Sequence, residues 1–245
     1  MGVSVKIDLR LSAQSPLHIG MGLGFGGILD DTVVKNAHRI GERLYPQAYV
    51  PGSTLKGRLR HYFQHAQQLL PHLSQTHNQQ ACRHQALVQC CAECRIFGSK
   101  LHQAPFRFPD AALVPELTEL SPDAMALLQT MQRTGTRLSR SRRVVKERHL
   151  YTIEVASEVL TFQTTISGNV ELTSHNADAL NASEIALLLL ACRLMEQLGG
   201  FKTAGLGKVR VTVEQVRVNG QVRLNGQADV DEHLRRFWIE GGGNP

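Results

Sequence analysis

Alternating apolar and polar positions predict strands at three places in the chain. The alternation covers residues 3–11, 160–172 and 207–216. Successive side chains of a strand point to opposite faces, so a period of two gathers the apolar residues on one face. Each of the three segments is therefore expected to form a strand with one face buried against a core.

Apolar residues at helical spacing predict helices over residues 53–70, about 121–132 and 183–198. Ser53 is the expected N-cap of the first helix, because its hydroxyl can accept a hydrogen bond from a free N–H group of the first turn. The glycines at 199–200 are expected to end the third helix.

The order of these segments predicts the fold class. Strand, helix, insertions, strand, helix and strand suit an α+β fold, with helices on one face of an antiparallel sheet and a topology close to ferredoxin-like. Residues 229–240 are expected to add a short amphipathic helix. No linker or repeat divides the chain, so a single domain over residues 1–245 is expected, with insertions at 72–98 and 133–153.

The composition of the chain predicts a polyanionic binding partner. The net charge is +6, and twenty of the 27 basic residues are arginines, whose planar side chains suit phosphates and stacked bases. The sequence lacks an apolar run of the length of a signal peptide or membrane span. A cytoplasmic protein with reduced cysteines and no membrane partner is therefore expected.

The strongest concentration of charge lies in a basic arm, residues 133–148. Its cations are Arg133, Arg137, Arg140, Arg142, Arg143, Lys146 and Arg148. Even spacing of the basic residues would place about two in such a segment, and like charges this close repel unless phosphates or solvent neutralise them. The arm is thus a candidate RNA contact, and a solvated loop is the alternative interpretation.

Two glycine-containing segments have the composition of phosphate-binding sites. Residues 51–58 combine a helix start, where free N–H groups attract anions, with four polar or basic side chains. These are Ser53, Thr54, Lys56 and Arg58. Residues 199–208 combine glycines with Lys202 and Lys208. The second segment lacks the P-loop spacing, so a helix stop followed by a tight turn explains it equally well.

Closely spaced cysteines and histidines predict a structural zinc site in the insertion at 72–98. The candidate ligands are Cys82, His84, Cys91 and Cys94. Thiolates of a CxxC pair can bind one tetrahedral zinc ion. His77 is the alternative fourth ligand, Cys90 competes with Cys91, and reduced thiols without metal are the other interpretation. Cys192 lies in the apolar helix and is expected in the core.

Two adjacent carboxylates, Asp30 and Asp31, follow a glycine-rich segment. Beside bound RNA they could hold Mg²⁺ or Mn²⁺ or assist proton transfer at a 2′-hydroxyl. Considered alone, they are more typical of a turn.

Taken in order, several motifs resemble the backbone subunit of type III CRISPR effector complexes, in the RAMP superfamily. The matching segments are PLHIG at 16–20, GGILDD at 26–31, YVPGSTLKG at 49–57, the CxxCRIFG run ending at Gly98, the arm at 134–153, and GGFKTAGLG at 199–207. Together they span roughly residues 7–211 in the order of the family.

The resemblance implies an RRM-like palm, a zinc-bearing insert and a β-hairpin thumb that enters the duplex of guide and target RNA. It adds RNA contacts at His18, Gly20, Arg60 and Thr203 to the basic residues already named. It also implies other subunits of the complex as partners, including copies or paralogues of this chain. The family's target-cleaving aspartate aligns best with Asp30, and because Leu29 intervenes, Asp31 is the alternative.

Three other functions remain open at this point. The chain could be a scaffold in the same complex without catalysis, or a stand-alone guide-processing endoribonuclease that acts without metal. A zinc-ribbon DNA-binding protein is disfavoured, because the sequence has one CxxC pair and predicts no recognition helix.

Overall fold

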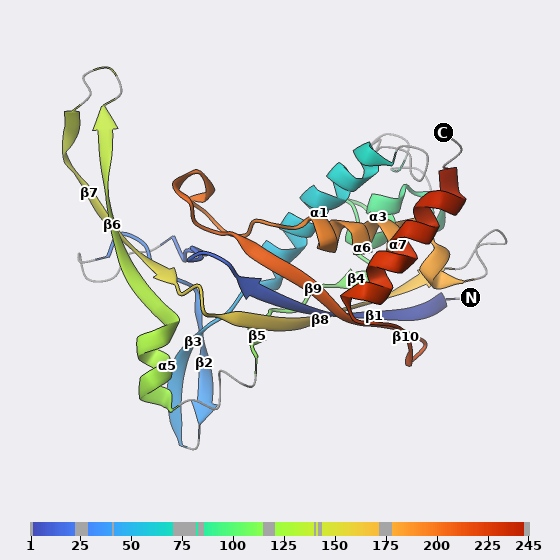
Figure 1. Ribbon diagram of the computed structural model, residues 1–245, viewed down its shortest axis with the longest axis horizontal. Helices are drawn as coiled ribbons and strands as arrows, with labels where there is room; N and C mark the ends of the chain where they lie inside the picture. The colour runs from blue at the N-terminus through green and yellow to red at the C-terminus, as the bar shows by residue number, and fades with distance from the viewer. Residues whose placement is uncertain are drawn as a thin grey trace.

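A computed structural model describes most of the chain. The described residues are 2–22, 29–40, 42–70, 82, 86–114, 121–139, 141, 144–171 and 178–242. They include a six-stranded antiparallel sheet in the order β10-β9-β1-β8-β4, with β5 also paired to β8 (Figure 1). The strands are β1 (Gly2–Ala13), β4 (Phe106–Arg107), β5 (Ala112–Leu113), β8 (Thr161–Glu171), β9 (Val209–Val218) and β10 (Gln221–Asn225).

Helices cover one face of this sheet (Figure 1). They are α1 (Gly52–Leu69), α3 (Ala92–Phe97), α6 (Ser183–Leu194) and α7 (Gln227–Gly242). Every second residue of β1, including Ile7 and Leu9, is buried and packs in one core with Leu55 and Leu59 of α1 and Leu188 of α6. The predicted α+β class, with helices on one face of an antiparallel sheet, is confirmed.

Two hairpins stand outside this sheet. The first pairs β2 (Lys35–Ile40) with β3 (Arg43–Ala48). The second is a long hairpin of β6 (Thr130–Ser139) and β7 (Val144–Ala156), which projects from the body and carries the basic arm (Figure 1). The short helix α5 (Pro122–Gln129) leads into β6 and packs on β3, where Gln129 Oε1 accepts a hydrogen bond from Ala48 N at 3.0 Å.

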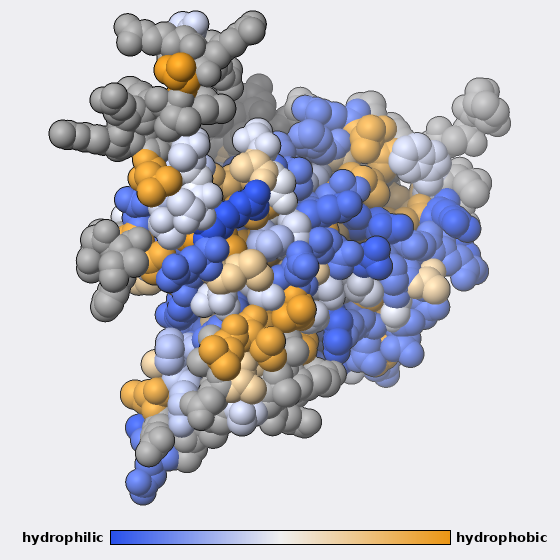
Figure 2. Space-filling model, turned by 60° about the vertical axis from the view of Figure 1, so that its left-hand side comes forward, coloured by the Kyte–Doolittle hydropathy of each residue, from blue (hydrophilic) through white to orange (hydrophobic). Residues whose placement is uncertain are grey.

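The surface on the hairpin side is mainly hydrophilic, with separate hydrophobic patches (Figure 2). Exposed apolar side chains include Leu127 and Leu128 of α5 and Met131 at the start of β6. Within the described residues, no helix has the length and apolar character needed to cross a membrane. Cys192 is fully buried in α6 as expected, and burial raises its pKa to about 12.

The helix ends differ from the sequence predictions. Helix α1 begins at Gly52 after Pro51, so Ser53 is not its N-cap; Gly52 N donates instead to Asp110 Oδ1 at 2.7 Å. Helix α6 ends at Leu194, before the glycines at 199–200, and α5 ends at Gln129, where the chain enters β6. After α5 and α6, long-range pairing takes the backbone groups that a longer helix would use. Thr130 pairs with Ala156 of β7, and Leu198 N donates to Gly207 O.

Candidate nucleic-acid interface and cysteine cluster

The two predicted phosphate-binding segments lie side by side. Arg58, one turn into α1, donates from Nε to the carbonyl oxygen of Gln197 at 3.1 Å. Lys202, in the single-turn helix η3 (Lys202–Ala204), is close enough to Arg58 for the guanidinium charge to affect its ionisation. The long hairpin reaches the same place, because Arg133 donates to Ala204 O at 3.4 Å. Segments far apart in sequence thus form one surface, called here the cationic surface: Arg58, His61 and Lys202.

The cations of this surface repel one another. Burial and then the Arg58 charge lower the pKa of Lys202, and burial and then Arg60 lower that of Lys56. Burial, followed by the charges of Arg58, His65 and Lys202, lowers the pKa of His61. Among the ion pairs of the described residues, none joins Lys56, Arg58 or Lys202 to a carboxylate. An external anion is the natural partner of such a cluster.

The glycines of the 199–207 loop allow the chain to pack against itself. Gly199 has φ +81°, and a Cβ there would lie 2.4 Å from His18 O. Gly207 has φ +85°, and its Cβ would lie 2.3 Å from Leu198 O. A Cβ would push Gly199 away from His18 and Gly207 away from Leu198, so these glycines allow the loop to close on itself and on the segment at His18.

Asp31 is engaged inside the protein. Its Oδ2 lies 3.0 Å from His18 Nε2, and its Oδ1 accepts from Gly22 N at 3.1 Å. His18 Nδ1 lies 2.9 Å from Glu154 O. The buried His18 ring thus lies between the Asp31 carboxylate and the backbone carbonyl of Glu154 and connects the segment that carries Asp31 to β7. Gly20 packs against the same carboxylate, where a Cβ would lie 2.3 Å from Asp31 Oδ2.

Asp30 is exposed and is held against the long hairpin. Its N–H donates to Thr152 O at 2.8 Å, and its Oδ2 accepts from Thr152 N at 2.7 Å. The next residue, Asp31, forms a parallel bridge with Ile153 of β7. Within the described residues, Asp30 Oδ1 has no hydrogen-bond donor. Asp30 is therefore more available than Asp31 to bind a ligand.

Glu154 of β7 connects β7 to the segment at residues 33–35, and this role was not predicted from the sequence. Its carboxylate accepts from Val33 N at 3.1 Å and pairs with Lys35 Nζ at 2.5 Å. Burial alone would raise its pKa, but hydrogen bonds from Lys35, Thr130 and Val33 outweigh that effect and lower it. The sequence did offer one indication of its role, namely a carboxylate between two apolar residues, Ile153 and Val155, which are buried in the structure.

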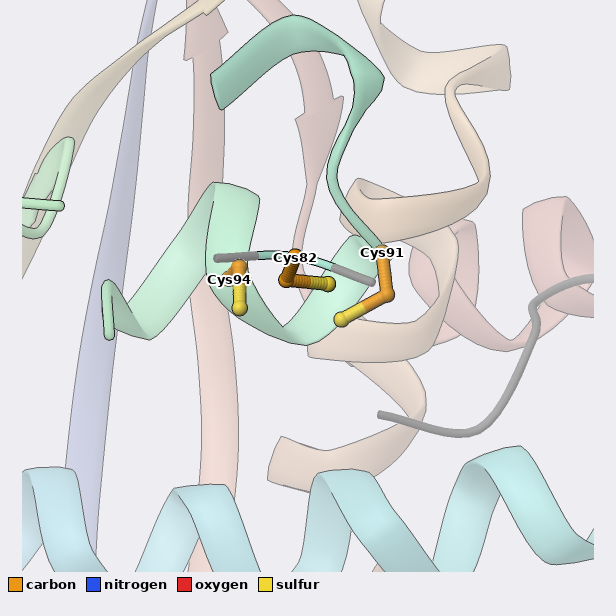
Figure 3. Close-up of side chains that lie close together, drawn as sticks. All are labelled: Cys82, Cys91 and Cys94. Carbon is orange, nitrogen blue, oxygen red and sulfur yellow. The ribbon is translucent and has the colours of Figure 1, made fainter. Parts of the chain in front are cut away.

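Three predicted metal ligands converge beside α3 (Figure 3). The sulfur atoms of Cys82, Cys91 and Cys94 all lie within 4.8 Å of one another. Sulfurs on one tetrahedral zinc ion lie about 3.8 Å apart, given zinc–sulfur bonds of about 2.3 Å, so this triad fits a metal. Cys90 instead directs its thiol towards the carbonyl oxygens of Cys82 and Ala86, so Cys91 is the member of the triad.

The three thiols of this triad differ in the direction in which their surroundings shift the pKa. Burial raises the pKa of Cys91 and Cys94, whereas hydrogen bonds from neighbouring cysteines outweigh burial at Cys82 and lower its pKa. A cation at the centre would favour all three thiolates. The predicted ligand His84 and its alternative His77 lie outside the described residues.

Two ion pairs hold the cysteine-bearing helix against the body. Glu93 of α3 is 1 % exposed and pairs with Arg60 of α1 at 2.6 Å. Arg95 of α3 pairs with buried Glu184 of α6 at 3.0 Å. Arg60, predicted to contact RNA, is therefore placed as a clamp between α1 and α3.

The remaining predicted contacts are distributed as follows. Ser53, Thr203 and Lys208 are exposed, and Thr54 is half-buried at the start of α1. Arg137 and Lys146 belong to the hairpin strands by their backbone. Arg140, Arg142 and Arg143 lie outside the described residues.

Comparison with known protein families gives one match. The family model described as the RAMP superfamily matches residues 10–210, which include β1, the cysteine triad, the long hairpin and the loop at 199–207. No curated protein matches the chain.

Proposed function

The chain belongs to the RAMP superfamily, and on that premise we propose that it is a guide-RNA-binding backbone subunit of a type III CRISPR effector complex. Membership of the family supports a CRISPR-associated, RNA-binding function. The observation that carries the finer proposal is the cationic surface, where Arg58 and Lys202 meet without a carboxylate partner among the described residues.

In this proposal the six-stranded sheet is an RRM-like palm within a single domain over residues 1–245. Its order β9-β1-β8-β4, with α1 following β1 and α6 following β8, supports a ferredoxin-like topology. Residues 72–98 are the zinc-bearing insertion and residues 133–153 the thumb. The thumb is the outer part of the long hairpin, whose projection from the body supports entry between bases of the guide–target duplex.

The RNA backbone lies along the cationic surface in this proposal. Ser53, Thr54, Lys56 and Arg58 approach phosphates at the start of α1, and Lys202, Thr203 and Lys208 approach them from the loop. The arginines of the thumb contact target RNA. Further subunits of the complex, including copies or paralogues of this chain, lie next to it along the guide.

Cleavage of target RNA is assigned to Asp30. Its exposed Oδ1 can take part in holding Mg²⁺ or Mn²⁺ together with phosphate oxygens, because such ions commonly use one or two carboxylates plus the substrate. The bound ion would stabilise negative charge that develops at the scissile phosphate. Asp31 and His18 support the peptide segment that carries Asp30, and β7 fixes its direction through Thr152.

Zinc at Cys82, Cys91 and Cys94 has a structural role in this proposal, with His84 as the fourth ligand. The ion pairs Arg60–Glu93 and Arg95–Glu184 connect the zinc-bearing insertion to α1 and α6. The metal therefore supports the helix that begins at the cationic surface.

The class of complex is tested by expressing the chain with its neighbouring genes, purifying the assembly and sequencing the bound RNA. A ladder of short guide-like RNAs with about one zinc per copy of the chain is the expected result. A Cys94→Ser variant should lose the zinc. Free chain that cuts repeat RNA without metal would instead support the stand-alone guide-processing enzyme.

Cleavage is tested in the assembled complex with Asp30→Ala and Asp31→Ala made separately. Asp30→Ala should abolish Mg²⁺-dependent cutting while guide content stays unchanged. Asp31→Ala should reduce cutting in parallel with a loss of stability, because it removes the partner of His18. Survival of cutting in both variants would leave the non-catalytic scaffold as the function.

A further inference from the structure

Three aromatic rings gather on the exposed side of α1. His61 and His65 are exposed, and Tyr62 is half-buried against the core. The ring centroids of His61 and His65 lie 4.6 Å apart, those of His61 and Tyr62 lie 5.5 Å apart, and those of Tyr62 and His65 lie 6.3 Å apart. The two histidines contribute nothing to the buried core, so packing does not explain their presence.

The ring cluster adjoins the cationic surface. The Arg58 guanidinium lies 5.2 Å from the centroid of Tyr62, so it already stacks on one ring. Lys202 is near enough to lower the pKa of His61 by its charge. From Arg58 to His65 the helix rises about 10 Å at about 1.5 Å per residue, a distance that accommodates a phosphate and the base attached to it.

Exposed rings next to cations that pair with no carboxylate of the described residues have the properties of a site for unpaired nucleotides. Every base has a flat π face, and stacking on aromatic side chains is tolerant of sequence, whereas nearby arginine and lysine hold the backbone. A guide RNA needs this kind of recognition, because its bases must be held independently of sequence. An acidic protein segment would use the cations but would gain little from the rings.

We propose that His61, Tyr62 and His65 form a stacking platform for an unpaired base of the bound RNA, whose phosphate lies at Arg58 and Lys202. The proposal rests on the guide-binding function proposed above and assigns it a base contact outside the thumb. It gives α1 two tasks: its first turn and a half meets phosphate and the next turn meets a base.

The test compares two pairs of substitutions in the full chain at about pH 8, where free imidazoles are neutral. His61→Gln/His65→Gln removes both rings, whereas His61→Phe/His65→Phe keeps rings and removes the polar nitrogens. Gln68→Ala, at an exposed position on the same helix, is the control. Affinity is measured for single-stranded RNA of guide length and for inorganic polyphosphate of similar charge.

The glutamine pair should bind RNA about tenfold more weakly, since each stacked base contributes roughly 1–3 kcal/mol. The phenylalanine pair and Gln68→Ala should bind RNA like the unaltered chain, and polyphosphate should bind all variants alike. In RNA carrying 5-iodouridine, irradiation should crosslink the unaltered chain within residues 61–65. Equal RNA affinity for the glutamine pair and the unaltered chain would overturn the platform.

A phenylalanine pair as weak as the glutamine pair would also overturn the platform, because hydrogen bonding would then be the role of the histidines. Failure of the unaltered chain to bind RNA is a different result. It would remove the guide-binding function itself, whatever the variants do.

Discussion

Two surfaces of this protein carry arginines in different electrostatic settings. On the face of the sheet away from the helices, Arg10 pairs with Glu214 at 2.7 Å and Arg217 with Asp8 at 2.9 Å. On the cationic surface, Arg58 and Lys202 lie close together, and no described carboxylate pairs with either. Arg10 and Arg217 are thus neutralised by neighbouring carboxylates, whereas Arg58 and Lys202 have charge left for phosphates. Neutralisation by neighbours, more than the number of cations, distinguishes a binding surface from a solvated one.

Neutralising cations on each surface should give the largest difference. Arg58→Gln/Lys202→Gln is expected to weaken RNA binding about a hundredfold, or about 3 kcal/mol, and to reduce the salt slope by about two. Arg10→Gln/Arg217→Gln should change RNA affinity less than about twofold. Fluorescence anisotropy over a range of salt concentrations measures both. Equal losses in the two variants would show that total charge, not the cationic surface, determines binding.

The ion pairs of the two sides should also differ in their effect on stability. Glu93 is 1 % exposed and Glu214 is 39 % exposed. Glu93→Gln is therefore expected to lower the free energy of unfolding by about 2 kcal/mol, and Glu214→Gln by less than about 0.5 kcal/mol. Denaturant unfolding provides the comparison. Similar values would mean that the α1–α3 clamp contributes no more than a surface pair.

Lowering the pH should remove the contribution of Glu154 to stability. Hydrogen bonds from Lys35, Thr130 and Val33 lower the pKa of Glu154 in the folded protein. A lowered pKa stabilises the fold above the unfolded value of about 4.3, and this contribution is lost as pH falls through the folded value. Glu154→Gln should thus cost about 1 kcal/mol at neutral pH, and this cost should shrink as the pH falls from about 4.3 through the lowered folded value. The measurement is unfolding free energy against pH, with Glu214→Gln as the control. A constant difference across that range would rule out the linkage.

The smallest effect concerns protonation at the ring cluster. His61 faces Arg58 and His65 on its own helix and Lys202 on η3, and these charges together with burial lower its pKa. Bound phosphates would favour the protonated form, so lowering the pH from about 8 to about 6 should strengthen RNA binding about two- to threefold. The His61→Phe/His65→Phe variant should show a flatter profile. A profile unchanged by that substitution would place the titrating group elsewhere.

Local patterns in the sequence were sufficient for the main elements. Alternating aliphatic residues in β1 and β9 predict a buried face, and the structure gives both strands one. The β2–β3 hairpin was not predicted, because KNAHRI and RLYPQA lack a clear alternation and contain Pro46. These strands form through pairing with each other and through the contact of Ala48 with Gln129, which is distant in sequence.

The candidate site was predictable only in parts. The composition of each segment indicated cations, thiols or carboxylates, and the cysteine triad is brought together by the structure. The approach of Lys202 to Arg58 depends on packing of the glycine loop against His18, which no local pattern encodes. The different roles of Asp30 and Asp31 likewise arise from β7 and His18, which lie outside the segment that carries them.

Strand β7 is continuous from the outer end of the long hairpin to the residues that hold Asp30. Val144 and Ile153 are nine residues apart, or about 30 Å along a strand. Asp30 is bound to Thr152 near the inner end of this strand, so a small rotation of the strand there moves its outer end by a larger distance. A tilt of about five degrees at Ile153 would displace Val144 by about 2.6 Å, so a duplex that moves the hairpin by less than one base step would turn the peptide at Thr152. In the proposed complex, a displacement of the hairpin by RNA would therefore reach the peptide that holds Asp30.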